Sequence, residues 1–274
     1  MLGEKPICSK MRNQAEEFLE NWRQWRAPFQ TQPQIVKQLE GGLTNTNYVI
    51  EAGSHRAVLR INNPDADQLG VCRQTELTVL KKLQSTAVVP RLYFSDSQIL
   101  VSEYIDGSAL DAEKALEPPV KKQIEQTIAV IQSVQITDLA PRNYQSYCRQ
   151  YCHHLSPLYL DKSITQSLLQ IADNIDRQEW TPVLCHHDLI PENIIMSTRG
   201  LFFIDWEYAA LGHPQFDYIR LLNSHHIMDI PADINRLQAL QAILVQLWYA
   251  IRYPELQETV KKQLIEIIET VKGK

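Results

Sequence analysis

The chain has no long apolar segment. Its longest apolar run, residues 242–251, is interrupted by Gln246, whereas a membrane-spanning helix needs about 20 apolar residues. Met1 is followed by the charged residues Glu4 and Lys5 rather than by an apolar leader. We therefore expect a soluble, cytoplasmic protein that is not inserted in a membrane.

The chain also has no excess of basic residues. It holds 27 Lys and Arg against 32 Asp and Glu, which gives a net charge of -5, and no basic stripe runs along it. Binding to nucleic acid depends on basic side chains that displace counterions from phosphates. The composition argues against nucleic-acid binding and is compatible with cationic ligands.

Cysteine is present without the spacing of a disulfide or zinc framework. The five cysteines are odd in number and form no C-x-x-C pair, so we expect free thiols. Cys148, Cys152 and His153 could place soft-metal ligands on one helical face. Tyr147 and Tyr151, which lie between and beside them, favour an ordinary packed helix instead.

Two short motifs carry the strongest chemical signal. Residues 185–195 read Cys-His-His-Asp-Leu-Ile-Pro-Glu-Asn-Ile-Ile, and residues 203–207 read Phe-Ile-Asp-Trp-Glu. Phosphoryl transfer from ATP to an alcohol needs a carboxylate beside the attacking hydroxyl and oxygen ligands for magnesium. We predict that Asp188 is the catalytic carboxylate and that Asn193 and Asp205 bind Mg2+.

The segment between the motifs predicts how they meet. Apolar runs over residues 193–196 and 201–204 flank Thr198-Arg199-Gly200, which is the pattern of a small hairpin. Such a hairpin would carry Asp205 back beside the loop that holds Asp188.

The motifs resemble those of a known superfamily. The pattern His186-x-Asp188-x-x-x-x-Asn193 with the later Asp205 resembles the catalytic motifs of protein-kinase-like enzymes. The wording His-His-Asp-Leu-Ile-Pro-Glu-Asn and Ile-Asp-Trp-Glu-Tyr-Ala is similar to the aminoglycoside phosphotransferase/choline kinase family, which also includes bacterial thiamine kinase. This resemblance implies ATP and Mg2+ as cofactors. We count His186 among the catalytic residues, with bracing of the loop as its main role and proton transfer as the alternative.

The element order agrees with the α+β, two-lobed fold that the resemblance implies. The first lobe is expected to span residues 1–104 and the second, mainly helical lobe residues 105–274. A turn-rich link is expected at residues 105–108. An amphipathic helix is predicted over residues 11–26. The first lobe should contain a five-stranded antiparallel sheet and one inserted helix, with strands at residues 34–39, 46–51, 56–61, 91–95 and 99–104.

Nucleotide contacts are expected at several places in the first lobe. Gly42, Thr44 and Asn45 belong to a Gly-Gly-Leu-Thr-Asn loop that is similar to the phosphate loop of choline-kinase-like proteins, although a Gly-Gly turn alone is usually only a hairpin. The backbone near Glu103 would meet the adenine, as the resemblance implies.

Arg60 stands where protein kinases place a strand lysine. The resemblance implies that it bridges the ATP phosphates and Glu76 on the following helix. The alternative is an exposed strand cation and an unrelated exposed helix anion.

The acceptor is expected to be a small-molecule alcohol. Only a short turn follows Asp205, and no A-P-E sequence is present, so a protein substrate would find little platform. Glu207, Trp248 and Tyr249 could bind a cation by charge and ring faces, and Asp217 is expected to fix the second lobe. Choline, ethanolamine and thiamine are the candidate acceptors; an aminoglycoside, or a kinase-like protein that binds nucleotide without turnover, are the alternatives.

Overall fold

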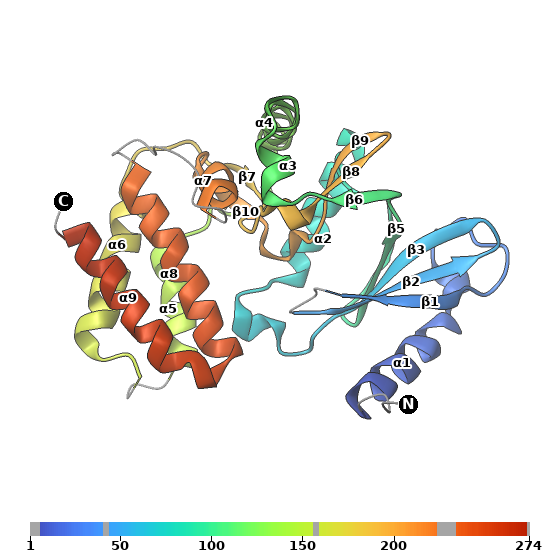
Figure 1. The fold of residues 1–274 in the computed structure, drawn as a ribbon, viewed down its shortest axis with the longest axis horizontal. Coiled ribbons are helices and arrows are strands. Elements are labelled where there is room, and N and C mark those ends of the chain that lie inside the picture. Colours follow the sequence, from blue (N-terminus) through green and yellow to red (C-terminus); the bar gives the residue numbers. More distant parts are fainter. Residues whose placement is uncertain (1–5, 41–43, 156–158, 224–233, 273–274) are drawn as a thin grey trace.

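The N-terminal part of the molecule is built on one antiparallel sheet. The computed structural model describes residues 6–40, 44–155, 159–223 and 234–272. Five strands lie in the order β1-β2-β3-β5-β4, with the helix α2 (Arg73–Leu83) inserted between β3 and β4. This confirms the predicted fold class and places the sheet at one end of an elongated molecule (Figure 1). The strands are β1 (Gln34–Leu39), β2 (Thr46–Ala52), β3 (His55–Ile61), β4 (Leu92–Ser95) and β5 (Ile99–Glu103).

The first helix is shorter at its C-terminal end than the sequence pattern predicts. Helix α1 (Pro6–Leu19) is followed by a single turn of 3-10 helix, η1 (Trp22–Gln24). The amide of Arg26 donates to the carbonyl of Tyr93 in β4 at 3.0 Å. Because that amide bonds to a strand, the chain cannot continue as a helix there, and the prediction over residues 11–26 was wrong in this part.

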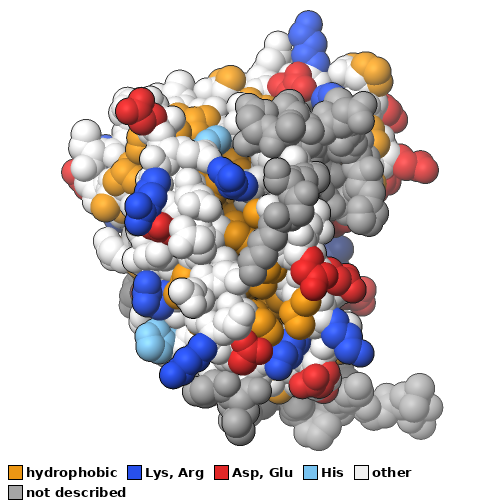
Figure 2. Space-filling view, turned by 90° about the vertical axis from the view of Figure 1, so that its left-hand side faces the viewer, with side chains coloured by type: hydrophobic (Ala, Val, Ile, Leu, Met, Phe, Trp, Pro, Cys, Tyr) orange, Lys and Arg blue, Asp and Glu red, His pale blue; other side chains and the backbone are white. Residues whose placement is uncertain are grey.

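The C-terminal part is mainly helical. Each long helix buries one apolar stripe against its neighbours, and charges of both signs are interspersed on the outer face of this end of the molecule (Figure 2). In the described residues, no helix is long and apolar enough to cross a membrane. The helices are α3 (Ala112–Leu116), α4 (Pro118–Gln132), α5 (Tyr144–His154), α6 (Lys162–Asp176), α7 (Phe216–Asn223), α8 (Asn235–Arg252) and α9 (Gln257–Lys272).

Short strands between the two parts support the acidic motifs. Strands β8 (Ile194–Ser197) and β9 (Gly200–Phe203) form the predicted hairpin. Strand β6 (Gly107–Ala109) pairs with β8, so the expected turn-rich link is partly a strand. A side chain at Gly107 would overlap the carbonyl of Met196, which explains why the close pairing needs glycine.

A second pair of strands precedes and follows the motifs. Strand β7 (Val183–Cys185) pairs with β10 (Ala210–Gly212). Two 3-10 turns, η4 (Pro191–Asn193) and η5 (Trp206–Tyr208), lie between them. Leu80 and Leu83 of α2 share one buried apolar cluster with Phe203 and Trp206. The inserted helix of the first lobe is thereby packed against the motifs of the second.

Candidate active site

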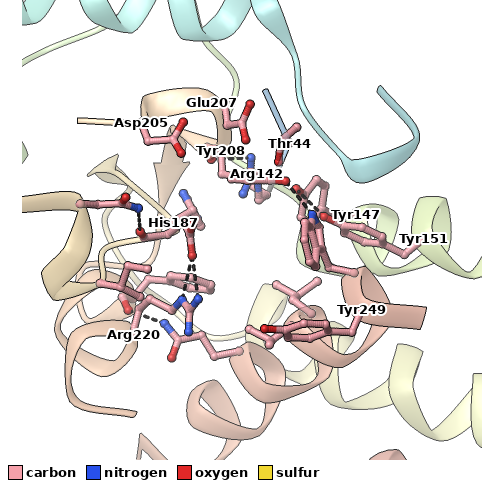
Figure 3. A pocket seen from close by; sticks show the side chains of 18 of the residues that line it. Thr44, Arg142, Tyr147, Tyr151, His187, Asp205, Glu207, Tyr208, Arg220 and Tyr249 are labelled. Atoms are coloured by element: carbon pink, nitrogen blue, oxygen red, sulfur yellow. Dashed lines mark hydrogen bonds and ion pairs between the residues drawn. The ribbon is translucent and has the colours of Figure 1, made fainter. Parts of the chain in front are cut away.

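A cavity of about 420 Å³ opens between the two parts of the molecule (Figure 3). Its wall contains the residues that the motifs predict for catalysis and metal binding, Asp188, Asn193 and Asp205, together with Thr44 from the loop before β2. The cavity is also lined by the three residues predicted to bind the acceptor substrate, Glu207, Trp248 and Tyr249. Four carboxylates and two guanidinium groups belong to the wall, so it is acidic on balance.

The loop that carries Asp188 is held by buried hydrogen bonds. The carboxylate of Asp217 accepts the amides of His186 and His187 at 2.7 and 2.9 Å. His187 has a φ of 65°, a left-handed conformation that is uncommon for a residue with a side chain. Asp217 thus stabilises a sharp turn immediately before Asp188.

His186 is fully engaged within this loop. Its Nε2 lies 2.8 Å from the carbonyl of Ile204, and its Nδ1 lies 3.3 Å from the amide of Asp188. The carbonyl can only accept, so Nε2 carries the proton and Nδ1 accepts from the amide. These contacts support bracing of Asp188 rather than proton transfer as the role of His186.

Asn193 and Asp205 are brought beside Asp188 by the hairpin. The Asn193 side-chain amide donates to the carbonyl of Asp188 at 2.9 Å, which leaves its Oδ1 as the group able to bind a cation. Burial between the lobes, followed by the charge of Glu207, raises the pKa of Asp205 well above its ordinary value, although the residue opens on the cavity. A cation would relieve this repulsion, and carboxylate and amide oxygens suit Mg2+.

Arg60 and Glu76 form the ion pair that was expected between β3 and α2. Two guanidinium nitrogens of Arg60 bind the two oxygens of Glu76 at 2.6 and 2.7 Å, and both side chains are buried. Burial alone would raise the pKa of Glu76, but the charges of Arg60 and Arg73 outweigh it and lower the pKa. The alternative of two unrelated exposed charges is wrong.

Arg73, which the sequence did not single out, extends this pair into the second lobe. Its Nη1 lies 3.0 Å from both Glu76 and Glu207, and its Nη2 donates to Asn45 at 2.7 Å. Asn45 in turn donates to Glu207 Oε2 at 2.8 Å. The side chains predicted for phosphate and for substrate, Asn45 and Glu207, are therefore both engaged in an interlobe network.

The remaining residues predicted to contact the nucleotide are Glu103, Thr44 and Gly42. The Glu103 carboxylate forms an ion pair with Arg199 at 2.9 Å, and its amide donates to the carbonyl of Arg91. Thr44 contacts the hydroxyl of Tyr208. Gly42 lies outside the described residues.

Aromatic side chains also form part of the cavity wall. The indole of Trp248 donates to the hydroxyl of Tyr208 at 2.8 Å. Tyr147 and Tyr151 of α5 donate to the carbonyls of Gly70 and Leu69, at 3.2 and 2.6 Å. Their rings line the cavity while their hydroxyls tie α5 to the loop before α2.

Two arginines were missed at the site. Arg142 lies over the ring of Tyr147 at 4.1 Å and donates to the carbonyl of Tyr208. Arg220 forms an ion pair with Asp188 at 2.7 Å. A signal for Arg220 was available, because it follows Asp217 by three residues and so shares its helix face.

The soft-metal alternative at Cys148 and Cys152 has no structural support. Cys148 is buried in the helical core, and burial raises the pKa of its thiol. In the part of the chain that the structure describes, no three His, Cys, Asp or Glu side chains are grouped to hold a metal ion. Mg2+ is usually bound by one or two carboxylates together with water and substrate phosphates, so Asn193 and Asp205 could form the protein part of such a site.

Comparisons with known proteins identify the family to which the chain is related. A family model described as "Phosphotransferase enzyme family" matches residues 35–253. Ethanolamine kinase 2 of Mus musculus is 27% identical over 210 residues, which cover 71% of this chain and 54% of the relative. The chain therefore spans about half the length of this curated relative.

Solved structures show the same fold. The crystal structure of choline kinase LicA from Streptococcus pneumoniae has a TM-score of 0.74 at 19% identity, covering 95% of this chain and 99% of that one. A structure of LicA in complex with AMP has a TM-score of 0.72 at 19% identity, covering 95% of this chain and 98% of that one. At this level of identity, the likeness is one of fold.

Proposed function

Because this chain belongs to the phosphotransferase enzyme family, we propose that it transfers a phosphoryl group from ATP to the hydroxyl of a small cationic metabolite. The family match confirms the resemblance that the motifs indicated. The observation that carries the proposal is the convergence of Asp188, Asn193 and Asp205 on one cavity that also has an aromatic wall. The names of the relatives, an ethanolamine kinase and a choline kinase, point to the same class of acceptor.

The residues present fit ATP and Mg2+. Asn193 Oδ1 and the Asp205 carboxylate are hard oxygen donors, and the pKa of Asp205 is raised by burial first and then by the negative charge of Glu207, which a cation would offset. Arg60 keeps N–H groups beyond those that bind Glu76, and these could donate to phosphates. Bound Mg2+ would neutralise charge on the phosphates, as in other phosphotransferases.

Asp188 is the residue we assign to the acceptor hydroxyl. Its carboxylate would orient the hydroxyl and accept its proton as the new bond forms. His186 and Asp217 hold the loop so that this carboxylate stays in place. Positioning of the reacting groups, together with electrostatic stabilisation, supplies most of the rate in this type of chemistry.

The aromatic wall favours a quaternary ammonium over a primary one. The hydroxyls of Tyr147 and Tyr151 donate to backbone carbonyls, and the hydroxyl of Tyr208 accepts from Trp248. Because Arg142 already lies over the ring of Tyr147, we assign the contact with a cation to the other rings of this wall. A trimethylammonium group needs only ring faces, whereas a primary ammonium needs three hydrogen-bond acceptors. We therefore rank choline ahead of ethanolamine and thiamine.

Glu207 takes an indirect role in this proposal. Its Oε2 accepts from Arg73 and from Asn45, and its side chain is buried. Direct contact with the acceptor then falls to Trp248 and its aromatic neighbours, while Glu207 adds negative charge to the cavity.

A substrate panel tests the proposal. Magnesium-dependent ADP release would be measured with choline, ethanolamine, thiamine, kanamycin and the neutral isostere 3,3-dimethylbutanol. We expect alcohol-dependent turnover with choline at the highest kcat/KM. Nucleotide binding without turnover of any alcohol would favour the non-catalytic alternative, and preference for kanamycin would favour an aminoglycoside-type enzyme.

A further inference from the structure

Helix α7 contacts the loop that carries Asp188 through two side chains. Asp217, in the first turn of the helix, holds the loop backbone through the amides of His186 and His187. Arg220, three residues later, reaches the loop through its side chain and lines the cavity (Figure 3). Residues spaced by three lie on the same face of a helix, so α7 presents both groups to the loop at once.

The contact between Arg220 and Asp188 is asymmetric. Both Nε and Nη2 of Arg220 donate to the same oxygen, Asp188 Oδ1, at 3.0 and 2.7 Å. Among the described residues, no hydrogen bond is formed with Oδ2. Two bonds to one oxygen restrain the rotation of the carboxylate and leave the other oxygen able to accept a hydrogen bond from an acceptor hydroxyl.

Asp188 lies among other carboxylates, and the contact with Arg220 offsets their repulsion. Asp188 shares the cavity wall with the carboxylates of Glu192, Asp205 and Glu207. A carboxylate in such company is repelled from its neighbours unless a cation holds it. Arg142, the other guanidinium in the cavity wall, is engaged with Tyr208 and Tyr147 instead.

We propose that Arg220 is a positioning residue that acts through Asp188 and sets the carboxylate oxygen that receives the acceptor proton. This inference rests on the proposed phosphotransferase function. In this proposal, α7 orients the side-chain carboxylate of Asp188 through Arg220, whereas His186 holds the backbone amide of Asp188.

The test compares three variants with wild type under saturating Mg-ATP and varied choline. Arg220→Gln keeps much of the side-chain length and removes the charge, whereas Arg220→Lys keeps the charge and loses the fork. Arg149→Gln, on the exposed side of α5, is the matched control for loss of one arginine. Thermal unfolding and ATP binding by calorimetry show whether each variant is folded and loads nucleotide.

A misplaced catalytic group costs on the order of 100-fold in rate. We therefore expect kcat of Arg220→Gln to fall by about 10- to 100-fold, with the Kd for ATP and the unfolding temperature close to wild type. Arg220→Lys should recover part of the rate, and added methylguanidine should restore part of it to Arg220→Gln. Arg149→Gln should behave as wild type.

Two results would overturn the inference. One is a kcat in Arg220→Gln equal to that of Arg149→Gln. The other is a loss of rate that neither lysine nor methylguanidine restores, because a merely structural role would not respond to either. If wild-type protein phosphorylates no alcohol in the panel, the proposed function fails, and the role of Arg220 fails with it.

Discussion

The buried ion pair of Arg60 and Glu76 allows the most quantitative prediction. The exposed fractions of the two side chains are only 9% and 3%. Removing one partner of a buried ion pair costs about 3 to 5 kcal/mol, because the other charge is left without compensation. Arg73 also contacts Glu76 and compensates part of its charge. Arg60→Ala should therefore lower the free energy of unfolding by about 3 kcal/mol.

Glu76→Gln should cost more than Arg60→Ala. It removes the carboxylate that both Arg60 and Arg73 bind, and Arg60 keeps Asn62 at 3.0 Å and the charges of Glu207 and Asp205, so we expect about 4 to 5 kcal/mol. In the double variant, neither charge is left behind, and the cost should be smaller than the sum by about 2 to 3 kcal/mol. The pair, rather than either residue, is then the stabilising unit.

Urea unfolding followed by both tryptophan fluorescence and circular dichroism would measure these free energies, provided that the two transitions coincide. Arg56→Ala is the matched control, because Arg56 lies on the same strand and pairs with Asp106 at the surface. It should cost less than about 1 kcal/mol. Equal costs for Arg60→Ala and Arg56→Ala, or a coupling energy of zero in the double variant, would refute the reasoning.

Three further predictions concern metal, substrate and pH. Asp205→Ala should raise the magnesium requirement for turnover far more than Asn193→Ala, because an anionic ligand is lost; identical magnesium titrations would contradict this. Trp248→Leu should lower kcat/KM for choline by about 2- to 30-fold, since a cation-π contact is worth about 0.5 to 2 kcal/mol, and should leave kcat/KM for 3,3-dimethylbutanol unchanged. Equal losses of kcat/KM for both alcohols would refute a contact between Trp248 and the ammonium group. Burial, followed by the charge of Arg142, lowers the pKa of His187 well below its ordinary value. The unfolded chain therefore binds a proton that the folded one does not, and the free energy of unfolding should fall below about pH 6.5 by up to about 1.4 kcal/mol per pH unit. His187→Asn, which tolerates the left-handed backbone, should flatten this slope, and an unchanged slope would exclude His187 as its source.

Local patterns predicted much of the architecture. The five strands of the sheet lie within two residues of their predicted bounds, because alternation of side chains along a strand is a local property. The hairpin of β8 and β9 was predictable for the same reason, and it brings Asp205 beside Asp188. The family motifs predicted Asp188, Asn193 and Asp205 for catalysis and metal binding, and all three line the cavity.

Contacts between distant segments were not predictable in this way. Arg73 and Glu207 are 134 positions apart, and the sequence offers no sign that the first turn of α2 lies over the second motif. Glu207 therefore resembled a free substrate carboxylate, although Arg73 and Asn45 engage it. Tyr151 and Leu69, which are 82 positions apart, meet only because α5 packs beside the loop before α2.

We propose that this cavity transfers a phosphoryl group from ATP to an alcohol through Asp188, and one measurement can test this. The most direct measurement incubates wild type and Asp188→Asn with Mg-ATP and choline, and follows the phosphoester product by mass spectrometry while calorimetry reports ATP binding. We expect phosphocholine from wild type, a loss of orders of magnitude in Asp188→Asn, and similar ATP affinity in both. Near-normal product formation by Asp188→Asn, or ATP binding by wild type without any phosphoester product across the alcohol panel, would contradict the claim.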